Sequence, residues 1–302
     1  MNITICAIAK NENVYLYEWA SYHLALGFSH IFIYDNNDID GERIEDVFSG
    51  TAIEFQITII DARGKKYFQK EAYNDCYKTQ DFDWCAFIDI DEFITFTKKS
   101  GITSIKQFLQ DKGNFEAVHL NWLCYGDSGH VRYKKGNVVD RFTKPIRPIN
   151  YQYAPGSEMQ NCQIKSIIRK GLPVDWTQDS TLSPSNPHTP YGLTKICNPI
   201  GKSVNNSPFN PICHEVAFIR HYKTKTVEEY RIKIERQCAD CDSKPYSYKG
   251  FFDINFPSFG KLMYLKKTYG EVDSWEYIKY YFRFCIIRFN LPLRFLFRSL
   301  KK

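Results

Sequence analysis

Short apolar runs alternate with amphipathic segments along the first half of the chain. Apolar runs rich in β-branched residues predict strands at residues 2–9, 31–34, 53–60, 84–88 and 117–123. Apolar side chains at helical spacing predict helices at residues 15–26, 44–48, 68–78 and 104–110. Strands that alternate with helices are typical of a mostly parallel, doubly wound sheet, so we predict an α/β fold.

The pattern loosens beyond residue 126. Residues 143–215 contain ten of the thirteen prolines, which is typical of loops, although their aromatic residues are unlike those of a disordered segment. We expect a loop-rich, substrate-shaping region carried on the sheet. A helix rich in charged residues is predicted at 227–239.

Three acidic residues, Asp89, Asp91 and Glu92, come where the apolar run 84–88 should leave the core. Ligands of open α/β sheets bind beyond the carboxyl ends of strands. Carboxylates this close repel one another, and a bound divalent cation compensates them best. Asp89 and Asp91 both leave the core only if the strand ends between them, because side chains alternate along a strand. An acidic turn without a ligand is the alternative, but the strand context favours a metal-assisted ligand site.

A second acidic loop, Asp35 to Asp40, follows the predicted strand at 31–34. Parallel strands would place both acidic loops at one edge of the sheet. One loop could contact a nucleoside while the other holds a cation against a diphosphate. The chain has neither a GxGxxG nor a GxxxxGK[ST] phosphate-binding loop, so a diphosphate would need a metal here.

Two further residues are candidates for chemistry. His221 precedes the predicted helix at 227–239; a lone histidine is more often structural, but a carboxylate site in need of donors makes it a candidate ligand. Asp127 follows a predicted strand and is either a general base or a turn residue. His23 lies on an apolar helix face, where we expect a core residue.

The formal net charge of +6 belongs to the end of the chain. Residues 277–302 contain seven Lys or Arg and no Asp or Glu, which leaves 33 basic and 34 acidic residues elsewhere. Basic and aromatic residues together are typical of a segment that lies on an anionic membrane surface, and a helix packed on the core is the alternative. Nucleic-acid binding is disfavoured, because the body of the chain carries no basic excess.

Compartment and cysteine usage agree with each other. No run approaches the ~18 uncharged apolar residues of a membrane span, and no signal peptide is recognisable, so we expect a cytoplasmic protein. The ten cysteines are irregularly spaced and mostly occupy apolar runs, as small core residues do. Cys238 and Cys241 form a single CxxC pair, which we interpret as ordinary thiols.

An ordered set of motifs resembles the family-2-like and family-92-like glycosyltransferases over roughly residues 3–240. The motifs are residues 5–12, Glu18-Trp19, Tyr22-His23, Gly27-Phe28, 31–36, Gln69, 72–74, 87–93, Tyr125-Gly126, 128–130, His221-Tyr222, Thr224-Lys225 and Glu228-Glu229. Single motifs are weak signals, whereas their order is specific.

The resemblance implies a GT-A fold and transfer of a sugar from a nucleotide diphosphate donor, usually linked to UDP, with inversion of the anomeric centre. Asp89 and Asp91 match the DxD metal motif for Mn²⁺ or Mg²⁺, and His221 matches a late histidine that completes the metal site. The positions matched to the donor side are Ala9, Glu12, Asp35, Gln69, Asn74 and Ile90.

The catalytic base is less defined by the resemblance. Asp127 stands where relatives often carry a serine, and His188 matches another family histidine, which makes it the rival. Such a base would deprotonate an acceptor hydroxyl as an oxocarbenium-like transition state forms.

These inferences predict a nucleotide-sugar-binding half at 1–125, an acceptor and catalytic half at 126–245, and a basic aromatic, helical tail at 246–302. We expect a peripheral enzyme on the cytoplasmic membrane face that adds a sugar to a lipid-linked glycan in surface polysaccharide or lipopolysaccharide assembly, the lipid being inferred from the tail. A non-catalytic nucleotide- or glycan-binding module is one alternative. A haloacid-dehalogenase-like phosphohydrolase is the other, although Phe93 stands where that family needs Thr or Val.

Overall fold

The protein is described by a computed structural model that covers residues 1–146, 161–178, 187–236, 251 and 255. It divides into two compact units, each described by itself. The first contains residues 1–123 and 161–221, and the second contains residues 124–146 and 222–236 with residues 251 and 255. The basic segment 277–302, the pair Cys238 and Cys241, and the rest of the predicted tail except residues 251 and 255 lie outside the described residues.

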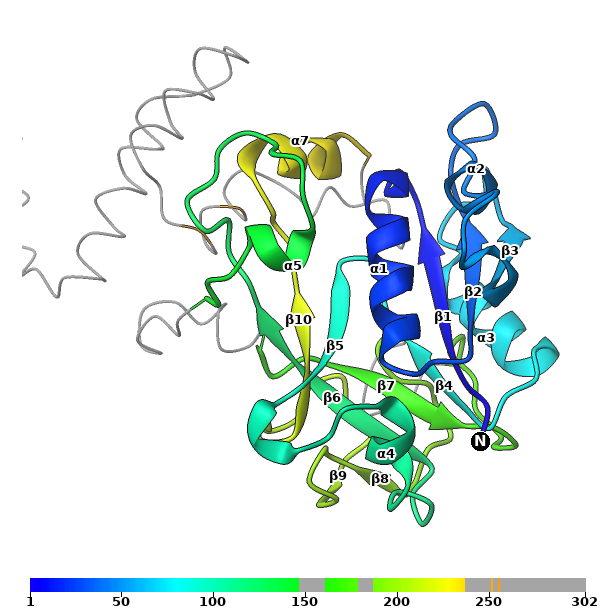
Figure 1. The fold of residues 1–302 in the computed structure, drawn as a ribbon. Helices are drawn as coiled ribbons and strands as arrows, with labels where there is room; N and C mark the ends of the chain where they lie inside the picture. Colours follow the sequence, from blue (N-terminus) through cyan, green and yellow to red (C-terminus); the bar gives the residue numbers. More distant parts are fainter. Residues whose placement is uncertain (147–160, 179–186, 237–250, 252–254, 256–302) are drawn as a thin grey trace, which may run out of the picture. The chain divides into compact units, whose positions relative to one another are not determined.

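The first unit is built on a parallel sheet (Figure 1). Its four parallel strands lie in the order β3 (Ile57–Asp61), β2 (His30–Asp35), β1 (Ile3–Ala9) and β4 (Trp84–Phe87). The connecting helices are α1 (Asn13–Ala25), α2 (Glu45–Phe48) and α3 (Gln69–Thr79). The predicted α/β class and the strand–helix alternation are confirmed. The third strand is shorter than predicted, because a 3₁₀ turn, η1 (Glu54–Gln56), precedes it.

The sheet continues beyond β4 with further strands, of which the sequence pattern predicted only the one at 117–123. The order proceeds through β7 (Ile164–Arg169), β6 (Ala117–Cys124), β10 (Ala217–His221) and β5 (Glu92–Phe96). The short strand β8 (Ile196–Cys197) pairs with β6, and β9 (Ser203–Val204) pairs with β8. Thus part of the proline-rich region, expected to form loops, supplies an internal strand of the sheet.

The register of these strands decides which residues meet. Strand β7 runs antiparallel to β4 with Ile167 opposite Ala86, so the start of β7 lies at the edge where β4 ends. Strand β10 runs antiparallel to β5 and places His221 opposite Glu92. Distant segments of the chain therefore reach the acidic turn after β4.

A hydrophobic core fixes α3 on the sheet. Cys6 and Ile8 of β1 pack in one buried cluster with Ala72, Tyr73 and Cys76 of α3. Seven cysteines fall within the described residues; all are free thiols and six are buried, which confirms their predicted core role. Burial raises the pKa of the Cys85 thiol well above its usual value, so it stays protonated.

His23 is a core residue, as predicted. Its Nδ1 donates to the Trp19 carbonyl at 2.9 Å, and its Nε2 accepts from the Ile94 amide of β5 at 3.2 Å. Burial lowers the pKa of His23 to about 3, despite the opposing effect of the Trp19 bond, so the ring is neutral. It therefore ties α1 to β5. Gly27, just beyond the end of α1, has a φ of 94°, as is typical after a helix C-terminus.

The remaining helices of the described chain are short. They are η2 (Lys98–Ser100), α4 (Ile105–Leu109), α5 (Val138–Arg141) and α7 (Val227–Arg236). Ser104 caps α4 by accepting the Gln107 amide at 3.2 Å. Within the described part of the chain, no helix combines the length and the apolar character that crossing a membrane requires.

The second unit is held by a buried charge pair. Thr226 and Glu229 begin α7 with a capping box, in which each side chain accepts the other's amide at 3.1 and 3.2 Å. Glu229 also binds Arg141 of α5 through two bonds of 2.9 and 3.0 Å. Both side chains are nearly inaccessible, at 6% and 3% exposure.

Candidate active site

The strand order creates a switch point in the first unit. The chain leaves β1 through α1 toward β2 on one side, and it returns through α3 to β4 on the other side of β1. The crevice beyond the ends of such a strand pair is where open α/β sheets bind ligands. The acidic turn Asp89–Glu92 directly follows β4 and so lies at this point.

Reciprocal hydrogen bonds shape the turn. The Glu92 amide donates to the Asp89 carbonyl at 3.1 Å, and the Glu92 carboxyl accepts the Asp89 amide at 2.9 Å. Glu92 is fully buried. Burial raises the pKa of Glu92 well above its usual value, with the charges of Asp89 and Asp91 adding to the effect and Lys165 opposing it. Glu92, whose role the sequence left open, is therefore a structural residue of the turn.

Asp89 is held from three directions. Its Oδ1 accepts from Gln69 Nε2 at 2.8 Å and from the Tyr73 hydroxyl at 3.3 Å, and its Oδ2 lies 2.9 Å from Lys165 Nζ. Burial favours the neutral acid, but the charge and the hydrogen bond of Lys165, together with His188, lower the pKa of Asp89 below its usual value. Burial and the Asp89 charge raise the pKa of Tyr73 well above its usual value, which keeps the hydroxyl protonated as a donor. Asp89 is thus an oriented carboxylate.

Asp91 meets the late histidine. His221 Nε2 lies 3.4 Å from Asp91 Oδ1, and each side chain is 5% exposed. The Trp122 ring packs on His221 with centroids 4.1 Å apart. His221 is the last residue of β10 and pairs with Glu92, the first residue of β5. This register brings His221 to Asp91, which directly precedes Glu92.

The Asp91–His221 pair fits a divalent ion as a partial ligand set. Two ligands at right angles on one ion lie roughly 3 Å apart, close to the observed separation. Carboxylate oxygen and imidazole nitrogen are both donors for Mn²⁺ or Mg²⁺ sites. No group of three or more His, Cys, Asp or Glu side chains among the described residues is arranged to hold a metal. Water and a bound diphosphate are groups that could complete the coordination sphere of an ion held by this pair.

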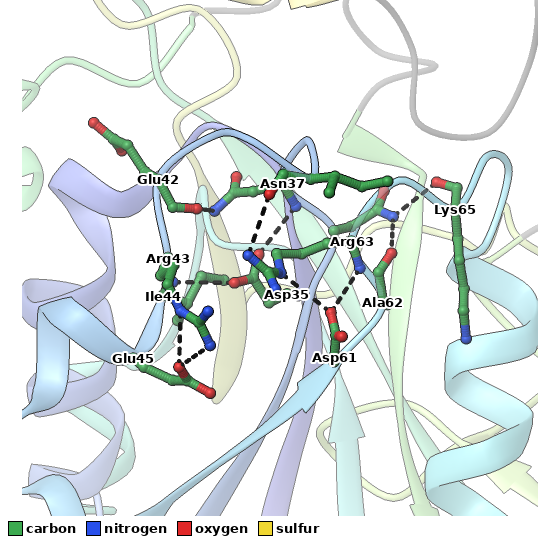
Figure 2. A network of polar contacts seen from close by, with 12 residues as sticks. Asp35, Asn37, Glu42, Arg43, Ile44, Glu45, Asp61, Ala62, Arg63 and Lys65 are labelled. Atoms are coloured by element: carbon green, nitrogen blue, oxygen red, sulfur yellow. Dashed lines mark hydrogen bonds and ion pairs between the residues drawn. The ribbon is translucent and has the colours of Figure 1, made fainter.

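Asp35, predicted to lie near the nucleoside, organises its own loop. Its Oδ1 accepts the Asn37 amide at 3.0 Å, and its Oδ2 accepts the Ile44 amide at 3.1 Å (Figure 2). The side chain is 4% exposed. Nucleoside contact by Asp35 stays a prediction, while its support of the loop after β2 is observed.

Two asparagines connect the loops that follow β1, β2 and β3. Asn37 accepts the Asn11 amide at 2.7 Å and donates to the Glu42 carbonyl at 2.9 Å (Figure 2). Asn36 donates to the carbonyls of Ala62 and Lys65, both at 2.8 Å. This network fixes the rim beside the switch point.

The other donor-side candidates differ in what they can offer. Asn74 is engaged with the segment after β7: it donates to Asp175 Oδ1 at 2.6 Å and accepts the Trp176 amide at 2.9 Å. Glu12 precedes α1 and is 8% exposed. Ala9 and Ile90 are each 1% exposed, so neither presents a side chain to a ligand. Their contacts with a nucleotide stay predictions.

The two candidate bases fall in different units. His188 packs on Trp122 with centroids 5.1 Å apart, and its Nδ1 donates to the Ile164 carbonyl at 2.7 Å, which leaves Nε2 as the basic atom of the neutral ring. Burial, then the charge of Lys165, lowers the pKa of His188 to about 3. That low proton affinity weakens it as a base.

Asp127 belongs to the second unit and forms a turn. Its Oδ1 accepts the Gly129 amide at 2.8 Å, and its own amide donates to Asn255 at 2.6 Å. The turn that the sequence offered as the alternative is therefore present. Neither residue is identified as the base by these contacts, and both stay predictions.

Sequence reasoning missed Lys165, Tyr73 and Trp122 as members of the site. Lys165 carries the only charge within the apolar run 164–168. A lone lysine in a buried strand needs an acidic partner, which was the available signal.

The chain is similar to known proteins in sequence and, more distantly, in structure. The S. aureus protein TarS, solved with UDP-GlcNAc, is 14% identical over 44% of this chain and 37% of its own, with a TM-score of 0.33, which is too low to support an assignment. A family 92 glycosyltransferase of Oryza sativa subsp. japonica is 27% identical over 47% of this chain and 24% of its own length. A galactan beta-1,4-galactosyltransferase of Arabidopsis thaliana is 30% identical over 39% and 25%, respectively.

The matched segments thus span about a quarter of these plant relatives. A model of glycosyltransferase family 92 matches residues 2–172, which is more than half of the chain and includes the acidic turn, Gln69, Tyr73 and Lys165. The chain therefore belongs to glycosyltransferase family 92.

Proposed function

We propose that this chain is a metal-dependent glycosyltransferase that moves a sugar, with inversion, from a UDP-sugar to a glycan acceptor. The observation that carries the proposal is the meeting of Asp91 and His221 beside the acidic turn at the switch point of the sheet. Family membership supports sugar transfer, and the name of the Arabidopsis galactosyltransferase supports a glycan as acceptor.

The chain's residues divide the work as follows. Asp91 and His221 would hold Mn²⁺ or Mg²⁺, which when bound neutralises the diphosphate as the bond to the sugar breaks. Asp89, oriented by Gln69, Tyr73 and Lys165, would position the donor. Asp127 or His188 would accept the proton of the attacking acceptor hydroxyl.

Metal dependence of nucleotide binding tests this proposal. Calorimetry should show UDP binding in Mn²⁺ or Mg²⁺ and a loss of at least about tenfold in affinity with a chelator, because Asp91 and His221 cannot compensate the diphosphate charge themselves. Full-strength binding without metal would refute the assignment. A screen of UDP-sugars for metal-dependent hydrolysis would then identify the sugar.

The lipid-linked acceptor and the cytoplasmic membrane face are proposals supported by the sequence of residues 277–302. Basic and aromatic side chains there match the chemistry of an anionic bilayer surface. Cosedimentation with anionic vesicles should occur for the chain and be lost when residues 277–302 are deleted. Equal binding by both proteins would remove the membrane proposal.

A further inference from the structure

Lys165 is a buried cation inside the candidate active site. It lies on β7 with 1% of its side chain exposed. Removing an ammonium from water is costly unless acidic groups replace the lost hydration. Asp89 at 2.9 Å and Glu92 at 3.7 Å supply those contacts. The antiparallel insertion of β7 next to β4 brings Lys165 to the turn.

The two aspartates of the DxD motif therefore have different surroundings. Asp89 faces Lys165, Gln69 and Tyr73, whereas Asp91 faces His221. The charge of Asp89 is offset by Lys165 at contact distance, so that a cation approaching Asp91 meets a turn with one of its negative charges already neutralised.

We propose that Lys165 is a positioning residue that makes divalent-ion binding depend on the nucleotide diphosphate. By holding Asp89, it leaves Asp91 and His221 as the ligands that the described residues offer to the ion. Two protein ligands are few for tight binding, and ions such as Mg²⁺ complete their sphere with phosphate oxygens and water. The diphosphate then supplies what the chain withholds. This inference rests on the proposed function, since it takes the ion and the diphosphate as the ligands of the site.

Removal of the lysine charge should have an effect that loss of structure would not produce. In Lys165→Met, the charge of Asp89 is no longer offset and the repulsion between Lys165 and the ion disappears, so Mn²⁺ alone should bind more tightly. Mn²⁺ and UDP should then assist each other less. The coupling is the gain in Mn²⁺ affinity that UDP adds, and in the variant part of that gain is present without UDP. A variant that merely damages the site would bind Mn²⁺ more weakly.

The experiment measures free Mn²⁺ by electron paramagnetic resonance, with and without UDP. In the unaltered chain, UDP should tighten Mn²⁺ binding by about tenfold or more. In Lys165→Met, affinity for Mn²⁺ alone should rise by about tenfold, and the effect of UDP should fall by the same factor. Lys165→Arg retains the charge and should behave like the unaltered chain.

Matched variants separate the causes. Lys112→Met removes another largely buried lysine, paired with Asp111 at 3.5 Å outside the site, and should change nothing in this assay. In Lys165→Met/Asp89→Asn, the Asp89 charge that Lys165 offsets is removed as well. The affinity for Mn²⁺ alone should then return toward that of the unaltered chain. If Lys165→Met does not fold, Lys165→Gln keeps a donor beside Asp89 without the charge and should shift Mn²⁺ binding in the same direction.

The possible outcomes separate a failure of the role of Lys165 from a failure of the proposed function. Coupling that is present in the unaltered chain and equally strong in folded Lys165→Met or Lys165→Gln overturns the role of Lys165 alone. Weaker binding of Mn²⁺ by either folded variant in the absence of UDP also overturns it. Absence of any coupling in the unaltered chain overturns the proposed function, and the role of Lys165 with it.

Discussion

Replacement of Asp91 by Asn will reduce sugar transfer by about 10²–10³-fold, the range expected when one electrostatic contact to the transition state is lost. Asparagine keeps the size of the side chain and one oxygen but removes the charge that faces His221 at 3.4 Å. Because the residue is 4% exposed, water cannot easily replace the missing charge. Turnover of a UDP-sugar at increasing Mn²⁺ measures the effect, and higher Mn²⁺ should restore only part of it.

Asp83→Asn is the matched control for this experiment. Asp83 directly precedes β4, at the end of the strand opposite to the acidic turn, and its side chain is 59% exposed. Its loss should leave turnover within about twofold, since an exposed charge at that distance is screened by solvent. Turnover of Asp91→Asn within tenfold of the unaltered chain at every Mn²⁺ concentration would contradict the assignment of Asp91.

Replacement of Arg141 by Met will destabilise the second unit by about 3–5 kcal/mol, the usual loss when one partner of a buried ion pair is removed. The methionine fills part of the volume but leaves the Glu229 carboxylate, which is only 3% exposed, without its bidentate partner. The same carboxylate caps α7 through the Thr226 amide, so the start of that helix should loosen as well. Urea denaturation followed by circular dichroism measures the change in the free energy of unfolding.

Arg231→Ala offers a comparison on the same helix. Arg231 pairs with Glu235 at 2.6 Å, but the two side chains are 33% and 57% exposed. Exposed pairs of this spacing contribute about 0.3–0.5 kcal/mol, so the variant should unfold nearly like the unaltered chain. A loss in Arg141→Met no larger than that in Arg231→Ala would show that burial does not strengthen the pair.

Much of the parallel half could be predicted from the sequence, for local reasons. Apolar runs and helical spacing placed β1, α1, β2, α2, α3 and β4 close to their observed bounds. The same local information placed Asp89 and Asp91 at the end of β4, although the strand ends at Phe87, before both residues rather than between them, and Asp91 stays buried. His23 followed from its place on the apolar helix face.

Strand β6 was predicted as well, but the other strands of the antiparallel half were beyond such reasoning. Strands β7 and β10 are short, and proline-rich or polar sequence surrounds them, so no periodicity identifies their neighbours in the sheet. The pairing of β7 with β4 and of β10 with β5 joins residues more than 75 positions apart in the chain, as Ala86 and Ile167 are. Local propensity contains no information about pairing at that separation.

The sequence by itself therefore determined the α/β class, the family and the acidic turn as the centre of the candidate site. Strand ends and carboxylates can be recognised from a short stretch of sequence. Only the tertiary structure decided that Asp89 faces a lysine while Asp91 faces a histidine. Both partners come from antiparallel strands whose register sets them at the turn, and a buried charge is stable only where packing delivers its counter-charge.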